Sequence, residues 1–585
     1  MVTPGDVPHP RGPSALLVLA LSGCADDPAG ASATGTSSSD TTQGSTATTA
    51  SPTTGPGCTP GAVVCSDAGA QTCDADGELA PAVACPAQCV PDVGCVDCVA
   101  GTTRCGEAGV ERCDDSGTWT VLEACNADQG ITCDADAGAC VGACLPASLF
   151  AAGPGHGPVG CEFYATTTRI SKANDDLLAV FVTNPGDEPT TVRATRNFWS
   201  GAVLEVAPHT AERIILPWDN ALAAPGGASI VSRGAAVHIQ SDRPVLVAQY
   251  APAVPDNSND ASLLLPVTSW GTRYPVAAYA GAELQPGTFA EASYVVVASA
   301  DATRVEVLGP PGLQVHAGAG VDASGTGTVM LDRGDALQVL ALAENDPTGS
   351  LVSADKPVQV LGAHACARVP TDHDFCDHLE ESMPPDVALG RTHVVIPPVT
   401  ADDPTQRRAQ VVRVVALAPR TGVLFQPAVA PAAVLAAGAF LELGPLDQPF
   451  VVQTTEPVLV AQYMVGTDWD DSLTDPSLTV ATAVESLTAA HWFHTVPGWD
   501  ATDVDIVARA GTTVQLDGAP LVDWTALGAS GWLFGHARLP PDEASGAHAI
   551  VADLPIAASV YSAGAGSSST SYWRTTGFAH GATGP

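Results

Sequence analysis

The stretch Ser241–Tyr250, SDRPVLVAQY, recurs as TTEPVLVAQY at Thr454–Tyr463. Weaker copies, ADKPVQVLGA and ADLPIAASVY, surround Pro357 and Pro555, so that successive prolines are 113, 100 and 98 residues apart. Runs of Val, Leu and Ile predict strands, and we expect the proline to open each strand, where no ladder N–H is lost. A strand that recurs at this period predicts four tandem β units.

Each of these prolines is preceded by two apolar runs around a turn, as in VFVTNPGDEPTTVRA and VVVASADATRVEVLG. Short runs of Val, Ile, Leu and Thr alternate with Gly, Pro, Asn and Asp, and no long stretch has a helical period. Residues 145–585 are therefore predicted to form an all-β domain of four small antiparallel β-sandwiches. The alternative is a β-propeller made of shorter sheets.

The charge of the chain excludes some partners. The 585 residues carry 63 acidic and 23 basic side chains, for a net charge of -40. Such a chain repels nucleic acid and anionic lipid headgroups, so neither is expected to bind. Charged residues make up only 15% of the chain, which favours folded β domains over acidic disorder.

Residues 1–23 contain an apolar run, Ala15 to Leu21, and then Ser22-Gly23, and the next residue is Cys24. This resembles the lipobox of bacterial lipoprotein signal peptides, which implies a lipid on Cys24. The alternative is a chance apolar run before a cysteine. Residues 24–57 are Ser, Thr, Gly and Ala with little to bury, and they predict a flexible tether. Because Ala25 is not the Asp that retains some lipoproteins, the outer membrane is the expected location.

Cysteines are concentrated in residues 58–144, where C-x6-C-x7-C-x11-C occurs twice. Units of about 40 residues bury too little apolar surface to fold unaided, so an exported chain would hold them with disulfides. Without Cys24, 16 of the 17 cysteines remain, an even number. Six cysteines per repeat leave 15 pairings open. Cys144 is paired provisionally with Cys161, and the DADG and DDSG pieces near Asp76 and Asp115 predict hairpin turns.

His364, Cys366, Cys376 and His378 form H-x-C…C-x-H, a pattern with two interpretations. In a reducing compartment it would indicate zinc. In an exported chain it predicts a disulfide, Cys366–Cys376, with His373 at the tip of the closed loop.

The loops after the proline strands carry the candidate binding residues Asp260, Asp475 and Trp469, with Asp377 at the matching place in the second unit. Clustered carboxylates suit Ca²⁺, but none of these loops has a complete calcium-loop pattern. Turn capping by Asp and Asn is the simpler interpretation. We therefore predict no metal and no cofactor, with Ca²⁺ as the alternative. An exposed Trp can anchor a partner, although Trp more often seals a core.

Catalytic signatures are missing from the sequence: it has no G-x-S-x-G, no H-E-x-x-H, no P-loop and no dinucleotide fingerprint. The chain is therefore predicted not to be an enzyme but to bind an extracellular protein or glycan at the cell surface, as an adhesion module. The alternatives are an exported hydrolase of polysaccharide or peptide and a structural component of the envelope.

Several spaced elements from Cys161 onward resemble the N-terminal domain of the IgGFc-binding protein family. They are Phe163-Tyr164, Pro244–Tyr250, Asp260–Pro266 with Trp270-Gly271, Cys366 with Cys376–Glu381 and Pro384-Pro385, and Asp475–Leu478 with Trp492–Trp499. The resemblance covers residues 161–580 and implies an extracellular recognition module without catalytic groups. Residues 58–144 resemble cysteine-rich modules of myxobacterial lipoproteins.

Overall fold

The computed structural model describes residues 57–145, 157–170, 178–223, 227–252, 258–469, 474–540, 546–565 and 568–580. The predicted signal peptide, Cys24 and almost all of the tether lie outside these residues. The chain divides into two compact units, Met1–Ala62 with Thr72–Pro81 and Val63–Gln71 with Ala82–Pro585. No helix in the described ranges is long and apolar enough to cross a membrane.

The two cysteine-rich repeats have the same disulfide pattern, which the sequence left open. In each, the first cysteine pairs with the third, the second with the fifth and the fourth with the sixth. The pairs are Cys58–Cys73, Cys65–Cys89 and Cys85–Cys95, then Cys98–Cys113, Cys105–Cys133 and Cys125–Cys140. Their short strands are β1 (Val63–Ser66), β2 (Gly69–Thr72), β3 (Gln88–Val90), β4 (Gly94–Val96), β5 (Thr103–Gly106), β6 (Gly109–Cys113), β7 (Trp119–Ala124), β8 (Thr132–Asp134) and β9 (Ala139–Val141), with the 3₁₀ turn η1 (Ala127–Gln129).

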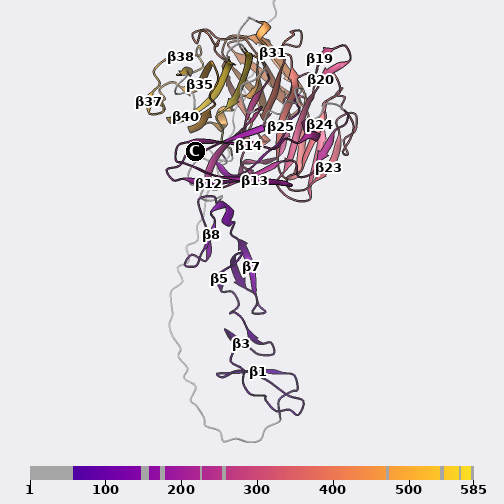
Figure 1. The fold of residues 1–585 in the computed structure, drawn as a ribbon, viewed down its shortest axis with the longest axis vertical. Helices are drawn as coiled ribbons and strands as arrows, with labels where there is room; N and C mark the ends of the chain where they lie inside the picture. Colours follow the sequence, from indigo (N-terminus) through magenta and orange to yellow (C-terminus); the bar gives the residue numbers. More distant parts are fainter. Residues whose placement is uncertain are drawn as a thin grey trace, which may run out of the picture. The chain divides into compact units, whose positions relative to one another are not determined.

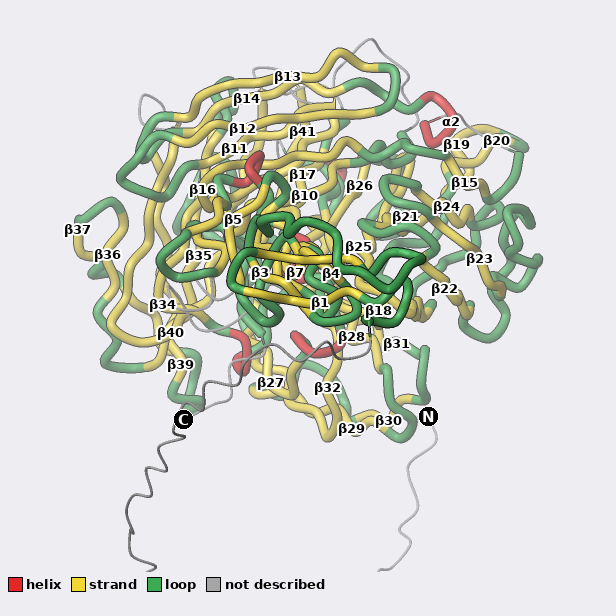
Figure 2. Tube along the Cα trace, turned by 90° about the horizontal axis from the view of Figure 1, so that it is seen from below, coloured by secondary structure: helices red, strands yellow, loops and turns green. Residues whose placement is uncertain are grey.

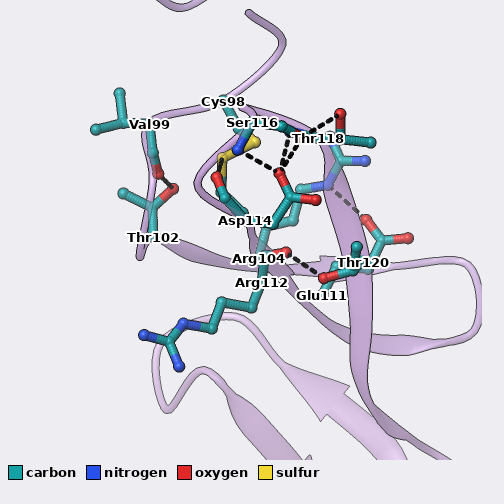
Figure 3. Close-up of a disulfide and its surroundings, with 11 residues drawn as sticks. Cys98, Val99, Thr102, Arg104, Glu111, Arg112, Asp114, Ser116, Thr118 and Thr120 are labelled. Carbon is teal, nitrogen blue, oxygen red and sulfur yellow. Dashed lines mark hydrogen bonds and ion pairs between the residues drawn. A yellow bond between two sulfur atoms is a disulfide. The ribbon is translucent and has the colours of Figure 1, made fainter.

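The DDSG piece is a tight turn, as predicted. The Asp114 carboxylate accepts the backbone N–H groups of Ser116 and Thr118, each at 2.9 Å. The Ser116 hydroxyl donates to the same oxygen at 2.6 Å, beside the Cys98 disulfide (Figure 3). All three of these donors to the Asp114 carboxylate lie within the turn, so the DDSG piece has the geometry of a hairpin connection.

The rest of the described chain is antiparallel β-structure in four repeats, which we call sandwiches 1 to 4; the sequence colours of Figure 1 separate them from purple to yellow. Sandwich 1 contains β10 (Gly160–Ala165), β11 (Leu178–Thr183), β12 (Thr190–Arg196), β13 (Trp199–Val206), β14 (Ala211–Leu216), β16 (Val237–Ala251) and β17 (Asp260–Leu264). Sandwich 2 contains β15 (Ile230–Ser232), β18 (Gly271–Pro275), β21 (Ala292–Ala298), β22 (Thr303–Leu308), β23 (Gly327–Leu331), β24 (Ala336–Leu340), β25 (Leu351–Ala367) and β26 (Asp377–Ser382), with the hairpin β19 (Ala282–Gln285) and β20 (Thr288–Ala290).

Sandwiches 3 and 4 complete the series. Sandwich 3 contains β27 (Gly390–Val395), β28 (Gln410–Ala416), β29 (Thr421–Gln426), β30 (Ala433–Leu435), β31 (Phe440–Leu446), β32 (Phe450–Met464) and β33 (Leu478–Val480). Sandwich 4 contains β34 (Thr488–Thr495), β35 (Ala501–Arg509), β36 (Val514–Leu516), β37 (Ala519–Pro520), β38 (Trp524–Ala526), β39 (Trp532–Leu539), β40 (Gly546–Ala565) and β41 (Ser568–Thr575). The described helices of the four sandwiches are short: α2 (Asn220–Ala223), η2 (Val267–Ser269), η3 (Asp386–Ala388), η4 (Thr467–Trp469) and η5 (Val484–Ser486).

The recurring proline segment is the central strand of every sandwich: β16, β25, β32 and β40. The first half of β16 pairs with β10 and β12, and its second half pairs with β11 and β17. One bent strand therefore contributes to both layers, and Val245 and Val247 face the core between them. The all-β prediction of tandem sandwiches is confirmed.

The prediction that the proline opens the strand is wrong, because β16 begins at Val237, upstream of Pro244. Along β10 the register shifts between Gly160, opposite Val245, and Glu162, opposite Gln240. Pro244 falls in this irregularity. Its missing N–H is tolerated there because the strand is changing from one layer to the other.

The four sandwiches close into a ring. The strands that follow the central ones contact each other in a cycle, β17 with β26, β26 with β33, β33 with β41, and β41 with β17. Figure 2 shows β17, β26 and β41 side by side near the middle of the ring. The sandwiches are thus arranged around a centre, as the blades of a propeller are, while each repeat keeps its own sandwich structure.

Buried arginines lie between successive sandwiches. Arg169 pairs with Glu291 at 2.7 Å between sandwiches 1 and 2, and Arg413 pairs with Asp346 at 2.8 Å between 2 and 3. Arg407 pairs with Asp505 at 2.7 Å between 3 and 4. Between 4 and 1, Arg574 Nε donates to the hydroxyl of Tyr250 at 3.4 Å. Since these guanidinium groups are mostly shielded from water, their bonds hold neighbouring sandwiches in fixed relative positions.

Candidate binding site

Four hairpin loops meet at one end of the ring, because each follows a central strand and precedes an innermost one. Hydrogen bonds join these four loops to one another in a cycle. His378 N–H donates to Ser258 Oγ at 3.0 Å, and Asp374 N–H donates to Asp468 Oδ2 at 2.8 Å. The Thr467 and Ser569 hydroxyls lie 3.1 Å apart, and Thr570 bonds to Asn259. The described parts of the four loops thus form one continuous surface.

Asp260 lies beneath this surface, fully buried, rather than on it. Its carboxylate accepts the N–H of Ala261 at 2.9 Å, of Glu380 at 3.1 Å and of Leu478 at 3.0 Å. Burial raises the pKa of Asp260 well above its usual range, although these three N–H groups act against the rise. One side chain therefore connects the innermost strands of sandwiches 1, 2 and 3.

Asp377 and Asp475 match each other in sandwiches 2 and 3, but they lie two residues before the position that matches Asp260, which is Leu379 in β26. They are 0% and 4% exposed. Burial raises the pKa of Asp377, and the charge of nearby Asp475 raises it further. In the fourth repeat, the hydroxyl of Ser571 is hydrogen-bonded to the backbone of Asp475. Sequence reasoning treated the three aspartates as equivalent loop residues, whereas the structure buries all three and separates Asp260 from the other two in register.

The predicted absence of a metal or cofactor, with Ca²⁺ as the alternative, stays a prediction. No group of three or more His, Cys, Asp or Glu in the described part of the chain is arranged so that it could hold a metal ion. The Asp260 carboxylate is also engaged by three N–H groups, which compete with a cation for its lone pairs.

Three side chains, His373, Phe375 and Trp469, form an exposed group that we call the aromatic rim. Trp469 is 40% exposed and Phe375 is 52% exposed. The rings of His373 and Trp469 are 5.3 Å apart, and His373 Nδ1 lies 3.3 Å from Asp468. Other tryptophans of this region, such as Trp499 and Trp532, are buried at 8% and 3% exposure. Trp469 thus differs from them in being open to a partner.

A disulfide holds the loop that carries Phe375. Cys366 and Cys376 are joined, with their Cα atoms 5.0 Å apart, and Cys144 and Cys161 are joined as well. These are the two pairs that the sequence suggested outside the cysteine-rich repeats. Gly466 N–H donates to the Val369 carbonyl at 2.8 Å, which fixes the loop against the segment that leads to Trp469. The aromatic rim is therefore preorganised by one covalent and several hydrogen bonds.

Sequence analysis identified His373 only as a loop tip and did not single out Phe375. The signal that could have found them is the combination of a short disulfide loop with a Trp-containing loop at the matching place of the next repeat. Neither loop alone indicates that the rings of His373 and Trp469 meet, because they come from sandwiches 2 and 3.

Comparison with known proteins places this geometry in a family. The family model described as IgGFc binding protein matches residues 260–562. The chain belongs to the IgGFc-binding protein family. The match begins at Asp260 and takes in the aromatic rim, the Cys366–Cys376 loop and the innermost strands β17, β26 and β33. Membership confirms the resemblance seen in the sequence and indicates a binding module.

The human protein named IgGFc-binding protein is 33% identical over 177 residues, which are 28% of this chain and 3% of the human one. The chain thus spans a very small part of the length of that relative. A solved structure, a tetra-tandem repeat in the extending region of a large adhesion protein, is 9% identical and covers 73% of this chain and all of its own, with a TM-score of 0.08. A score this low carries no argument about the fold.

Proposed function

We propose that this member of the IgGFc-binding family is a lipid-anchored surface protein that binds an extracellular protein through its aromatic rim. The observation that carries the proposal is the exposure of Trp469 and Phe375 at a loop surface that is otherwise fixed by hydrogen bonds. Large aromatic side chains contribute much contact area at low entropic cost, which is why they dominate interface energetics.

Charge narrows the class of partner. Asp372 and Asp374 are exposed next to the aromatic rim, and the whole chain carries a net charge of -40. A partner with a basic patch would be attracted at long range, and the attraction would be screened by salt. We therefore expect the association rate to fall as ionic strength rises.

The test is a binding array of extracellular proteins and glycans probed with the whole chain, with and without Ca²⁺. Immunoglobulin Fc belongs in the protein set because of the human relative's name. For any protein that binds, Trp469→Ala is expected to weaken the affinity about 30-fold, the effect of losing a central aromatic anchor. The matched control is Phe198→Asn, which removes another exposed aromatic from the β12–β13 turn, far along the chain. Asn tolerates the positive φ of that position.

Equal losses in the two variants, or none in Trp469→Ala, would remove the aromatic rim from the proposal. Binding to glycans alone would replace the protein partner with a carbohydrate. Binding only in the presence of Ca²⁺ would support the calcium alternative for the loops that contain Asp260, Asp377 and Asp475.

The anchor needs a separate test, since Cys24 lies outside the described residues. Cys24→Ala is expected to abolish palmitate labelling and to release the protein from the membrane fraction. Ser22→Ala is the control, because a small residue before the cleavage site should be tolerated. Palmitate on the Cys24→Ala variant would show that the lipid is attached elsewhere.

A further inference from the structure

A group of buried polar side chains lies where sandwich 1 meets sandwich 2. Thr168 follows β10, Gln249 belongs to the central strand β16, and His378 and Glu380 are on β26. All four are completely buried, at 0% exposure. Their hydrogen bonds bring a hydroxyl, a carboxamide, an imidazole and a carboxylate together out of reach of bulk water.

The Thr168 hydroxyl is placed as a nucleophile. Its Oγ1 lies 3.1 Å from His378 Nε2 and 2.7 Å from Glu380 Oε2. On the other side of the ring, His378 Nδ1 lies 2.9 Å from the backbone carbonyl of His364. A carbonyl only accepts, so Nδ1 donates to it. The single hydroxyl proton of Thr168 is donated to the Glu380 carboxylate, which can withdraw it and leave Oγ1 as the nucleophile.

The Gln249 carboxamide is placed as the electrophile. Its Oε1 accepts the backbone N–H of Thr166 at 2.9 Å, and its Nε2 donates to Glu380 Oε2 at 3.1 Å. The Thr166 N–H is directed at the oxygen that would gain negative charge if the carbonyl carbon were attacked. Because the Thr168 hydroxyl and the Gln249 nitrogen bind the same Glu380 oxygen, nucleophile and leaving group are held beside each other.

We propose that Thr168 and Gln249 react to form an intramolecular ester. Glu380 Oε2 takes the hydroxyl proton, Thr168 Oγ1 bonds to Gln249 Cδ, and the Cδ–Nε2 bond breaks. The departing nitrogen, which donates to the same Glu380 oxygen at 3.1 Å, receives that proton from Glu380 and leaves as ammonia. Hydroxyl and carboxamide become ester and ammonia, so atoms balance and no oxidant, metal or cofactor is needed. Exclusion of water then protects the ester from hydrolysis.

The chain contains its own comparison, because Gln462 occupies the matching position in the second copy of the PVLVAQY motif. Gln462 is also buried, at 5% exposure, but its Oε1 has no hydrogen-bond donor among the described residues. Its carboxamide therefore lacks the oxyanion donor that Gln249 has, and it should remain an amide.

The ester would tie the segment after β10 to β16, next to the point where Cys161 is bonded to Cys144. A pulling force that enters the ring through the N-terminal side would then be carried by a covalent link from Thr168 to the central strand. Such a link suits a protein held at its N-terminal end, although the chemistry is independent of the proposed binding function.

The test is mass spectrometry of the reduced and alkylated whole protein. The expected intact mass is lower by one ammonia molecule than that calculated for the same processed and alkylated chain without the ester. A digest should contain a branched peptide joining Thr168 to Gln249, which hydroxylamine opens, and the peptide with Gln462 should be unmodified. Gln249 found as an amide, or as an unjoined glutamate, overturns the proposal.

Variants assign the roles. Thr168→Val and Glu380→Ala should each restore the full mass, while Thr168→Ser keeps the hydroxyl and should keep the ester. Circular dichroism checks that each variant is folded. If Thr168→Val still lost ammonia, the nucleophile would be another residue, such as the buried Thr166, and the assignment to Thr168 would be wrong.

Discussion

The cysteine-rich segment 58–144 and the ring are stabilised in opposite ways. In the segment, most buried apolar side chains are cysteines, with Val96, Val110 and Ile131 besides. The ring has extended cores of Val, Leu, Ile and Tyr, and it uses arginines and an aspartate between sandwiches. A short repeat depends on covalent bonds because it has little to bury, while a long one can also enclose charge. The difference can be tested from both sides.

Reduction of the disulfides should give the largest difference in stability between the two regions. Each native disulfide of a small domain contributes about 2–5 kcal/mol, so the loss of three per repeat exceeds what such a repeat has in reserve. In hydrogen-exchange mass spectrometry with a reductant, peptides of 58–144 should lose all protection. Peptides of β25 and β32 should keep theirs, and equal loss in both regions would break the comparison.

Replacing a buried cation should damage only the ring. Arg413 lies over the rings of Tyr279 and Phe440, at 4.1 and 4.7 Å, and pairs with Asp346. Arg413→Met removes a buried guanidinium, leaves Asp346 without its partner, and is expected to lower the free energy of unfolding by about 3–5 kcal/mol in urea titration. The control Arg304→Met breaks an exposed pair with Glu306 and should change it far less. Equal effects would show that Arg413 is not a bridge between sandwiches.

Asp260→Asn tests the centre of the ring. The amide nitrogen would face N–H groups that now bind a carboxylate oxygen, leaving a backbone donor unsatisfied. The expected loss in unfolding free energy is about 3 kcal/mol, measured by urea denaturation. Asp523→Asn, at an exposed position, is the control. A stable Asp260→Asn protein would mean that the three sandwiches are held without this carboxylate.

The smallest expected effect depends on pH. Burial alone would lower the pKa of His536, but Asp503 and Asp505 outweigh it and raise the pKa to about 8. Arg538, Arg407 and Tyr561 also contact these aspartates. A raised pKa gives stability that is complete below pH 6.5 and is lost as pH rises through 8, about 2 kcal/mol here.

Urea titrations of the ring between pH 6 and 9 should show this decrease, and His536→Gln should remove it. The exposed His209 provides the control, since His209→Gln should leave the slope unchanged. A slope that survives in His536→Gln would assign the titration to another group.

The repeat in sequence was enough to predict the four sandwiches, because the PVLVAQY pattern reports the strand at the centre of each. Ring closure was not predictable, since β17 and β41 are far apart in the chain and nothing local marks their contact. β15 was missed for the same reason: Ile230–Ser232 lie in the first repeat but pair with β24 of the second. Local sequence patterns indicate where strands lie, while the pairing of one strand with another depends on the whole fold.

The candidate site was predicted only in part. The loops after the central strands and Trp469 were found from sequence, because their position recurs. The burial of Asp260 and Asp475 was not, since an acidic residue in a polar loop normally faces water. The apolar Leu263–Leu265 and Leu478 that follow these aspartates were the available sign of burial. The disulfide pattern of 58–144 also needed the structure, because spacing does not choose among pairings.

The closing contact of the ring has a consequence for biosynthesis. Asn259 and Thr570, which join the first loop to the last strand, are separated by 311 residues. At ordinary rates of translation, the first partner waits on the order of tens of seconds for the second to emerge. During that interval Asp260 and the inner face of β17 are uncovered, so an unfinished chain exposes the surface that the complete one buries. A quality-control factor that recognises this face would distinguish nascent or truncated chains from finished ones.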